Sequence, residues 1–311
     1  MFKIGVFGDT GMVGTIITQL LSAHKQVQIV FRKNSTRTDG NLDDCDLCFL
    51  ATKDAESMRY ASEMLVQNKI VIDMSGAFRL PCKDFEKWYE ITHSAPLLLS
   101  KAVYGMPALY AEKIRQANLI ANPGCFATSV ILALRPLVSL LAPDQEAIIV
   151  STSGNSGARK ESELESNDIT YSFGKKHKHV PEMNIYSNYT VDFTPVVLRS
   201  VFRGINTNIR VSLSDILKEL PNEKAQALIE ERIRSAYIPE DLIEIVQDSP
   251  DYLWGTRDVN NTNKMLLKIR VEDGFAYICS MLDNLIKGAA GQAIENMNIV
   301  LGLPRLTGIA S

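Results

Sequence analysis

The stretch Gly8-Asp9-Thr10-Gly11-Met12-Val13-Gly14 decides the fold, because it joins an apolar run at Lys3–Phe7 to an apolar helical pattern at Val13–Ser22. Glycines at this spacing let the backbone approach a pyrophosphate, and the N–H groups of the helix N-terminus then point at the phosphate. The position of the turn behind a first strand predicts dinucleotide binding, with an ordinary tight turn as the alternative. The predicted cofactor contacts here are Gly8, Thr10, Gly11, Met12, Val13 and Gly14.

The alternation of apolar runs and helical patterns continues to about residue 120. Strands are predicted at Val27–Phe31, Leu47–Ala51 and Ile70–Asp73, with a helix at Ala55–Gln67. Strands separated by helices of ten or more residues are typical of a parallel, doubly wound sheet. We therefore predict an α/β protein whose first domain, residues 1–122, is a Rossmann-type fold that binds the cofactor.

After about residue 145 the pattern changes to alternation with a period of two, as at Ile205, Ile209 and Val211. The dipeptide Asp273-Gly274 separates two apolar runs and predicts a tight hairpin. We predict a second, α+β domain at residues 123–283 with a mixed or antiparallel sheet. A C-terminal helix within 284–311 is expected to pack back on the first domain.

The segment after the second predicted strand bears on the choice of cofactor. NAD-selective folds of this type place an Asp or Glu here, where it accepts from the ribose hydroxyls. The stretch Phe31–Arg37 has no acid and three cations, Arg32, Lys33 and Arg37. These cations suit the 2′-phosphate of NADPH, which we predict as the cofactor, with Ser35 as a further contact. A solvated basic loop is the alternative.

Cys125 is the candidate nucleophile. Pro123-Gly124 predicts a turn, and the apolar run Val130–Leu134 behind it predicts a helix, so Cys125 falls in the first turn of that helix. There the helix dipole favours the thiolate, which is the form that attacks carbonyl carbon. Core filling is the alternative for a cysteine at this place.

Two of the four histidines, His177 and His179, lie close together in a stretch predicted to be strand or loop. With Glu182 they offer metal ligands, but the sequence supplies no convincing third ligand and no helical spacing, so we predict no metal. A general acid or base that works with Cys125 is the more economical role.

Two further segments are candidates for binding. The stretch Ser151–Lys160 follows the apolar run Ala147–Val150 as a loop of glycines and hydroxyls with two cations, which suits an anionic ligand; a flexible loop without a role is the alternative. The stretch Asn284–Ala293 gathers small residues at a predicted helix start, which lets a backbone or a ring approach closely. The candidates are Ser153, Gly154, Arg159 and Lys160 in the first stretch and Asn284 and Gly288 in the second.

Composition disfavours several classes of function. The 311 residues carry 33 basic and 36 acidic side chains, a formal net charge of -3, which argues against nucleic acid and anionic membranes as partners. We find no apolar run long enough for a membrane span and no signal pattern, so we expect a cytoplasmic protein. Cys45 and Cys48 form a CxxC for which core packing is expected rather than a metal or redox site. His24 and His93 are expected in surface contexts without a role.

Several of these segments occur together, in order, between residue 5 and about residue 308. In this order they resemble the N-acetyl-gamma-glutamyl-phosphate reductases, a family grouped with aspartate-semialdehyde dehydrogenase and related in fold to glyceraldehyde-phosphate dehydrogenase. The length is similar to that of the shorter of two subgroups. The segments that carry the resemblance are GDTGMVG (8–14), DMSGAFRL (73–80), YGMPAL (104–109), NPGCFAT (122–128), SGNSGAR (153–159), HKHVPEM (177–183), RGI (203–205) and NLIKGAAGQAIENMN (284–298).

The resemblance implies a reductase of arginine biosynthesis that converts N-acetyl-gamma-glutamyl phosphate and NADPH to the semialdehyde and phosphate, through a thioester on Cys125. It implies that His177 and His179 supply the base and part of the substrate pocket and that Asn284 lies near the nicotinamide. It also implies that the chain forms a dimer or tetramer, with catalysis and oligomerisation in the domain at residues 123–283. His179 is our preferred base, because Val180-Pro181 stiffens the backbone beside it. The expected substrate contacts are Arg203, Arg159, Lys160 and Glu182.

Two residues depart from the family pattern: Asp9 stands where a small residue is more usual, and Ala77 stands where an acid is expected. Asp9 places a like charge beside a phosphate. Other functions stay open at this point: an acyl-phosphate reductase for aspartyl phosphate or a carrier-linked aminoadipyl phosphate, a dinucleotide-sensing protein without catalysis, and a cysteine hydrolase using Cys125 and His179.

Overall fold

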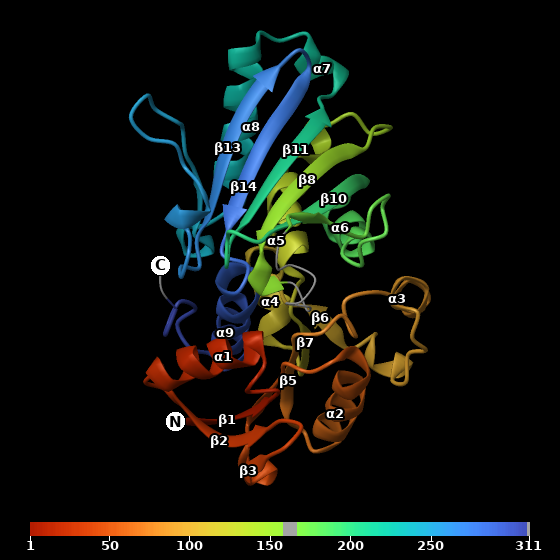
Figure 1. The fold of residues 1–311 in the computed structure, drawn as a ribbon, viewed down its shortest axis with the longest axis vertical. Helices are drawn as coiled ribbons and strands as arrows, with labels where there is room; N and C mark the ends of the chain where they lie inside the picture. The colour runs from red at the N-terminus through yellow and green to blue at the C-terminus, as the bar shows by residue number, and fades with distance from the viewer. Residues whose placement is uncertain (158–166, 310–311) are drawn as a thin grey trace. The chain divides into compact units, whose positions relative to one another are not determined.

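The computed structural model describes residues 1–157 and 167–309. The chain divides into two compact units, drawn in Figure 1. Unit 1 comprises Met1–Gly124 and Ala289–Ser311, and unit 2 comprises Cys125–Gly288.

Unit 1 is built on a seven-stranded sheet of order β3-β2-β1-β4-β5-β7-β6. Its neighbouring strands run parallel except for β2 and β3, which are antiparallel. This confirms the predicted doubly wound sheet. The strands are β1 (Phe2–Phe7), β2 (Val27–Lys33), β3 (Thr38–Gly40), β4 (Leu47–Leu50), β5 (Ile70–Asp73), β6 (Ala102–Tyr104) and β7 (Leu119–Ala121), and the helices are α1 (Met12–Ala23), α2 (Asp54–Val66), α3 (Cys82–Tyr89), α4 (Pro107–Arg115) and α9 (Gly291–Val300), with 3-10 turns at Leu42–Asp44 and Pro96–Leu98.

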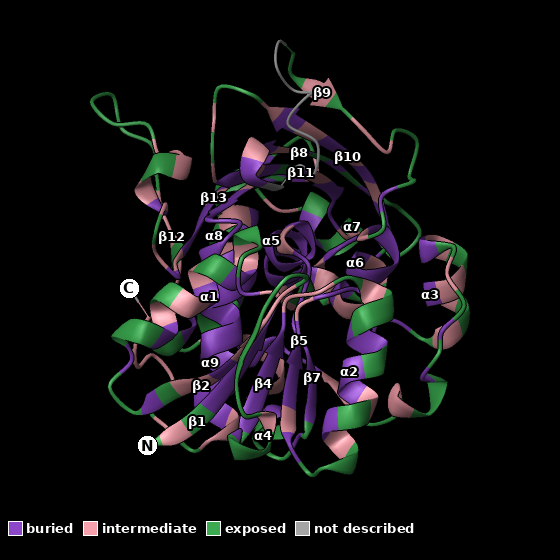
Figure 2. Cartoon of the chain, turned by 60° about the horizontal axis from the view of Figure 1, so that its bottom comes forward, coloured by how far each residue is buried: buried purple, intermediate pink, exposed green. Residues whose placement is uncertain are grey.

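The central strands of this sheet are buried on both faces, which explains why β4 and β7 are apolar throughout rather than alternating. Figure 2 shows β4 and β5 as buried strands between the helices of the unit. One face packs against α2 and α3, where Met58 and Phe85 are in the core. The other packs against α1, α4 and α9, so that Ile17 shares one apolar cluster with Ile294.

The segment after β5 is held in place by the hydrogen bonds of a buried aspartate and an arginine. Asp73 is fully buried, and its carboxyl group accepts from the Ser75 backbone N–H at 3.1 Å and from the Ser75 hydroxyl at 2.8 Å. Burial raises the pKa of Asp73 to about 6, although the Ser75 hydrogen bonds favour the charged form. Arg79 donates to the carbonyl oxygens of Asn122 and Met74 at 2.8 and 2.9 Å, which fastens the segment to the end of β7.

Unit 2 contains a second seven-stranded sheet, of order β12-β13-β14-β11-β8-β10-β9. Its pairs are antiparallel except for β8 with β10 and β12 with β13, which confirms the predicted mixed sheet. Its strands are β8 (Ala147–Gly154), β9 (Ile169–Thr170), β10 (Val191–Leu198), β11 (Ile205–Ser212), β12 (Ile243–Ile245), β13 (Met265–Glu272) and β14 (Phe275–Leu282), and its helices are α5 (Cys125–Leu134), α6 (Val180–Ser187), α7 (Asp215–Lys218) and α8 (Asn222–Ala236), with 3-10 turns at Arg135–Leu140, Asn155–Gly157, Pro239–Asp241 and Thr256–Asp258.

The hairpin between β13 and β14 has the turn that its sequence predicts. Asp273 and Gly274 take φ values of +50° and +76°, and Glu272 pairs with Phe275 on either side. Positive φ at both central residues is what a two-residue type I′ turn requires. A local dipeptide therefore sets the register of these two neighbouring strands.

The two faces of the unit 2 sheet differ in how far other parts of the unit cover them. Helices α5 and α8 pack on β11, β13 and β14. Along β8, Ala147 and Ile149 are buried, whereas Ile148 and Val150, which alternate with them, are exposed. The face that carries Ile148 and Val150 is therefore partly apolar and open.

Two local expectations are wrong. The predicted loop from Ser151 begins as strand, because β8 extends to Gly154 and continues hydrogen-bonded to β10 and β11. His24 and His93 are buried, not exposed. The helix start predicted within Asn284–Ala293 is present, as a π-helical turn at Ile286–Ala290 that leads into α9 at Gly291.

Both buried histidines have structural partners. Each ring bonds at both nitrogens: His24 to Asn298 and the Gln26 N–H, and His93 to the Ala77 carbonyl and the Ala95 N–H. A histidine whose two ring nitrogens are both hydrogen-bonded can be buried at little cost. The residues beside His24 and His93 in the sequence do not indicate these hydrogen bonds. Along residues 1–157 and 167–309, no helix is long and apolar enough to cross a membrane.

Candidate active site

The glycine turn of unit 1 is shaped so that side chains are excluded. Gly8 has a φ of +77°, and a Cβ atom there would lie 2.2 Å from the Ala51 carbonyl oxygen. A Cβ atom at Gly14 would lie 2.0 Å from the carbonyl oxygen of Gly8, so helix α1 packs directly on the turn. Gly11 is the N-cap of α1 and donates its N–H to the Gly8 carbonyl at 3.1 Å. Such a cradle fits the pyrophosphate of a dinucleotide at the N-terminus of α1.

Thr10, Met12 and Val13 complete the turn. Met12 and Val13 are the first two residues of α1, and Thr10 and Met12 are exposed. The predicted helix start near Met12 is confirmed.

Acidic residues pair with Arg37, the one of the three cations that follows β2, and the sequence interpretation missed them. Arg37 Nη2 donates to the Asp9 carboxylate at 2.5 Å, and Arg37 Nε donates to Asp39 at 2.7 Å. Asp39 lies in β3, directly opposite Arg32 of β2. The stretch Phe31–Arg37 itself has no acid, but the fold brings one from the glycine turn and one from the next strand.

The rest of this loop is also held by hydrogen bonds. Asn34 donates to Asp9 at 2.9 Å, and its Oδ1 accepts from the backbone N–H groups of Thr36 and Arg37 at 3.0 and 2.9 Å. Ser35 is exposed, and Arg32 is partly exposed. The loop is therefore a closed turn fastened to Asp9.

Cys125 is the first residue of α5, as predicted, and it is partly exposed. Every residue after it in that helix is buried, so the apolar pattern anchors the helix and leaves its first residue at the edge of the core. Gly288 lies close to Cys125: a Cβ atom at Gly288 would lie 2.8 Å from the Cβ atom of Cys125. Gly288 thus leaves room for Cys125 and cannot accept a side chain without a shift.

His177 is buried and neutral. Its Nδ1 accepts the backbone N–H of His179 at 3.1 Å, so the ring carries its proton on Nε2, which donates to the Tyr171 hydroxyl at 3.2 Å. Burial, with the nearby His179 ring as the second cause, lowers the pKa of His177 to about 2.

His179 is the N-cap of α6, with Pro181 inside the first turn, so the histidine pair lies at a helix start rather than on a strand or in an open loop. The two imidazole rings lie 4.7 Å apart between centroids. Phe126, next to Cys125 on α5, packs edge-on against both, at 5.4 Å from His177 and 6.1 Å from His179. His179 is the more exposed of the two histidines.

Tyr171 is a site residue that the sequence did not indicate. Its hydroxyl bonds to His177, and the pKa of Tyr171 is raised by burial and, second, by the charge of the nearby Cys125. A tyrosine ahead of a glycine–lysine loop has no motif that would identify it. Glu182, in the first turn of α6, is fully buried, and its charge partly offsets the lowered pKa of His177.

The remaining predicted residues of unit 2 form a second polar cluster. Arg203 donates to Asp283 at 3.3 Å and to Asn261. The Asn284 side chain accepts from the Gly204 N–H at 2.8 Å and donates to Ser156 at 3.1 Å. Asn284 therefore ties the start of β11 to the turn after β8.

Other predicted residues are placed as follows. Ser153 and Gly154 are buried at the end of β8, and Gly154 packs on Phe202, where a Cβ atom would lie 2.5 Å from the backbone. Arg159 and Lys160 lie outside the described residues. In the described part of the chain, no group of three or more His, Cys, Asp and Glu side chains could hold a metal ion.

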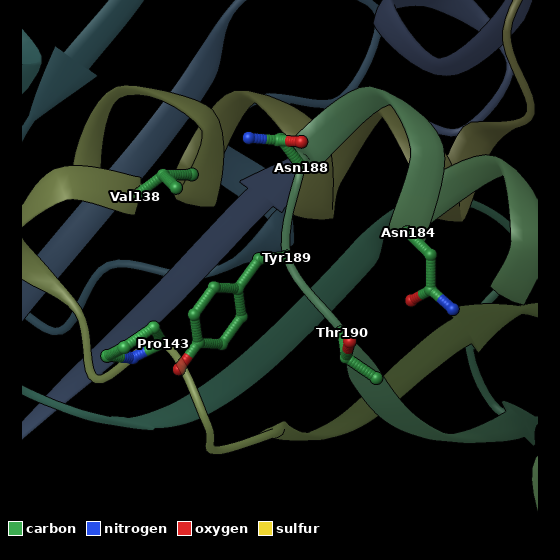
Figure 3. A pocket seen from close by; sticks show the side chains of 6 residues that line it. All are labelled: Val138, Pro143, Asn184, Asn188, Tyr189 and Thr190. Atoms are coloured by element: carbon green, nitrogen blue, oxygen red, sulfur yellow. The ribbon is translucent and has the colours of Figure 1, made fainter.

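A pocket of about 330 Å³ in unit 2 is separate from these clusters (Figure 3). None of its six lining residues is a predicted site residue. The Tyr189 hydroxyl already donates to the Ala142 carbonyl at 2.5 Å, and Asn184 Oδ1 already accepts from the Val191 N–H at 2.9 Å. The lining residues are Val138, Pro143, Asn184, Asn188, Tyr189 and Thr190.

Solved structures with similar folds are aspartate-semialdehyde dehydrogenases. Aspartate semialdehyde dehydrogenase II of Vibrio cholerae, complexed with ASA, has a TM-score of 0.71 at 17% identity, covering 97% of this chain and 98% of that chain. The enzyme of Candida albicans with NADP has a TM-score of 0.73 at 17% identity and the same coverage. These similarities establish the fold.

Sequence comparisons establish the family. A model described as semialdehyde dehydrogenase, NAD binding domain, matches residues 33–117, and one described as semialdehyde dehydrogenase, dimerisation domain, matches residues 125–284. The N-acetyl-gamma-glutamyl-phosphate reductase of Nitrosospira multiformis is 33% identical, covering 99% of this chain and 98% of the relative. That of Thermus thermophilus is 32% identical, covering 98% of each. The first alignment runs over 351 positions, so the relative has segments that these 311 residues lack. The chain belongs to the N-acetyl-gamma-glutamyl-phosphate reductase family.

Proposed function

We propose that this chain catalyses the reaction after which its relatives are named: N-acetyl-gamma-glutamyl phosphate, NADPH and a proton give N-acetylglutamate semialdehyde, phosphate and NADP+, a step of arginine biosynthesis. The observation that carries the proposal is Cys125 in the first turn of α5, with Phe126 packed against the rings of His177 and His179. The names of relatives that match along 98–99% of the chain supply the substrate. We assign cofactor binding to unit 1, and catalysis and oligomerisation to unit 2.

Cys125 acts as the nucleophile in this proposal. Its thiolate attacks the carbonyl carbon of the acyl phosphate, the bond from that carbon to the phosphate oxygen breaks, and phosphate leaves with the electron pair. Backbone N–H groups in the first turn of α5 stabilise the oxyanion. NADPH, when bound, supplies the hydride that reduces the resulting thioester carbon. The carbon–sulfur bond then breaks with its electron pair on the sulfur, which releases the aldehyde and regenerates the Cys125 thiolate, while the departed phosphate takes up a proton from solvent.

His179 is the proposed base that takes the Cys125 proton and later returns it. His177 is a positioning residue, since its pKa of about 2 keeps it neutral throughout the working pH range and both of its nitrogens are engaged. The His179 N–H that donates to His177 fixes the backbone from which the His179 ring projects. The low pKa of His177 and its two hydrogen bonds support His179 as the base, a choice that the sequence leaves nearly balanced.

The anionic groups of the substrate are assigned to Arg203, with Arg159 and Lys160 as further candidates. Arg203 is only 15% exposed and is held by Asp283, so its guanidinium is already oriented. Glu182 is fully buried beside the histidine turn, which favours a role in holding that turn over direct contact with substrate.

NADPH is proposed as the cofactor because of Arg32, Lys33 and Arg37 beside the turn. The glycine cradle would hold the pyrophosphate through the α1 N-terminus, and Ser35 is an exposed hydroxyl on the same loop.

The open face of the unit 2 sheet is the proposed oligomer contact, for a homodimer or tetramer. Support comes from the match of residues 125–284 to a dimerisation-domain model and from exposed Ile148, Val150 and Tyr277. Ile148→Asp should therefore shift the sedimentation coefficient towards the monomer. The matched control is Ile216→Asp, which places the same charge at an exposed apolar residue of α7. Equal behaviour of the two variants would reject this face.

The activity is tested in the reverse direction. Purified protein is mixed with NADP+, phosphate and N-acetylglutamate semialdehyde, and formation of NADPH is followed by absorbance, with aspartate semialdehyde as the competing substrate. Phosphate-dependent reduction of NADP+ with the acetylated substrate is expected. Preference for aspartate semialdehyde would assign a related acyl-phosphate reductase, and binding of NADPH without turnover of any semialdehyde would assign a sensing protein.

A further inference from the structure

Asp9 is an unusual residue in the glycine turn because it is a buried, charged group beside a site for phosphates. Its side chain is only 5% exposed, and its two oxygens accept from Arg37 Nη2 at 2.5 Å and Asn34 Nδ2 at 2.9 Å. The carboxylate therefore engages the loop at 34–37. Charge-assisted hydrogen bonds of this length are among the stronger polar contacts in proteins.

Arg37 is the cation most affected by this arrangement. Its guanidinium is 44% exposed and is paired with Asp9 through Nη2 and with Asp39 through Nε. Both carboxylates come from outside the loop that carries the cations, one from the glycine turn and one from β3. Arg37 thus carries one positive charge and contacts two negatively charged carboxylates.

A phosphate that approaches Arg37 consequently meets a local charge of about -1 rather than +1 within the three side chains. Attraction of a 2′-phosphate, which is nearly dianionic, is weakened by both carboxylates, whereas a 2′-hydroxyl carries no charge to repel. Arg37 Nη1 lies outside the two pairs and still offers donors. The cluster thus reduces discrimination between the two cofactors without removing the phosphate contact.

We propose that Asp9 is a specificity-determining residue: by pairing with Arg37 it limits the preference of this chain for NADPH over NADH. The inference rests on the proposed use of a nicotinamide dinucleotide and adds which residue sets the choice between its two forms. Asp39 acts in the same direction more weakly, because its carboxylate is 56% exposed and is screened by solvent.

The test measures equilibrium binding. NADPH and NADH are titrated by nicotinamide fluorescence, and the fragments 2′,5′-ADP and 5′-AMP by calorimetry, against wild-type protein, Asp9→Asn, Arg37→Gln and the double variant. Asp9→Asn should tighten binding of NADPH and 2′,5′-ADP about fivefold and change NADH and 5′-AMP less than about twofold. In the Arg37→Gln background, Asp9→Asn should change the NADPH to NADH ratio less than about twofold, because only the direct repulsion between carboxylate and phosphate is then removed.

Other outcomes are decisive against the inference. Equal changes for all four ligands would show that Asp9 only anchors the loop, and the full fivefold tightening of NADPH in the Arg37→Gln background would show a charge effect that does not act through Arg37. Asp39→Asn is the second variant should Asp9→Asn fold poorly by thermal melting, and a change in its NADPH to NADH ratio of less than about 1.5-fold would then overturn the proposal. Wild-type protein that binds neither dinucleotide would overturn the proposed function itself.

Discussion

Two polar regions of the molecule differ in how their side chains are held. At the glycine turn of unit 1 the side chains are charged, and at the histidine pair of unit 2 they include a neutral, buried ring. At the turn, Asp9 and Arg37 keep full charges and are fixed by pairing. At the pair, burial keeps His177 uncharged, and neutral hydrogen bonds to Tyr171 and His179 orient it. The first region is therefore sensitive to salt and the second to pH, so the two can be perturbed independently.

The largest expected effect separates the two regions. Cys125→Ser removes the nucleophile, and turnover should fall about a thousandfold or more, because a hydroxyl at neutral pH is a far weaker nucleophile than a thiolate. The NADPH dissociation constant should stay within about twofold, since Cys125 belongs to unit 2 and the glycine turn to unit 1. Turnover and fluorescence titration are measured on the same preparation. Near wild-type activity would reject covalent catalysis through Cys125.

The next effect divides the histidine pair itself. His179→Asn should lower kcat by about two to four powers of ten, the usual contribution of a general base. His177→Asn should lower kcat less than about tenfold and act mainly on KM, because a ring with a pKa of about 2 does not take the proton.

The His177→Asn variant is the conservative control in this comparison, because the new side chain keeps an acceptor for the His179 N–H. A greater loss of kcat for His177→Asn than for His179→Asn would reverse the assignment. A loss below tenfold in both variants would exclude this pair as the source of the base.

Stability against pH should show the neutral state of His177 directly. The pKa of His177 in the folded protein is about 2, well below the ordinary 6.5. As the pH falls below 6.5 the unfolded chain therefore gains a proton that the folded chain does not, and the free energy of unfolding decreases. Between pH 6.5 and 4.5 this loss should amount to about 2 kcal/mol of unfolding free energy in the wild type, and His177→Asn should remove it. Urea unfolding at each pH measures the difference.

Asp73 supplies a control of opposite sign within unit 1. The pKa of Asp73 in the folded protein, about 6, lies above its ordinary 3.8. The contribution of Asp73 to the free energy of unfolding therefore declines as the pH rises from about 4 to 6. Asp73→Asn should therefore gain stability relative to wild type over that interval. Parallel pH curves for wild type and His177→Asn would show that His177 is not held neutral.

The smallest expected effect concerns the charges at the turn. Raising the salt concentration from about 50 to about 500 mM should weaken NADPH binding about fivefold more than NADH binding, because exposed charges are screened. Neutralising Arg32, Lys33 and Arg37 together should abolish this difference and narrow the gap between the two cofactors. Titrations at both salt concentrations provide the measurement, and equal salt dependence for the two cofactors in wild type would contradict a charge-based preference.

Local sequence rules predicted the features that depend on neighbouring residues. The glycine turn, the start of α5 at Cys125 and the Asp273-Gly274 hairpin each follow from the backbone preferences of a few adjacent residues. Cys48 and Cys279 lie in strands, as their apolar surroundings indicate.

Partners from distant segments were not predictable in the same way. The acids around Arg37 come from Asp9 and Asp39, and the second of these depends on how β3 turns back on β2. The neutral state of His177 depends on a hydroxyl at Tyr171 and on burial, which no local pattern encodes. The burial of His24 likewise depends on Asn298, at the far end of the sequence.

The return of α9 to unit 1 affects the order in which the chain can fold as the ribosome makes it. Ile4 and Val6 share their apolar cluster with Ile294 and Met297, so this core is closed by a segment that is synthesised after the whole of unit 2. Unit 2 is one continuous segment and can complete its core while that surface of unit 1 is still uncovered. Nascent chains arrested before Ala289 should therefore be cleaved by protease in unit 1 sooner than in unit 2.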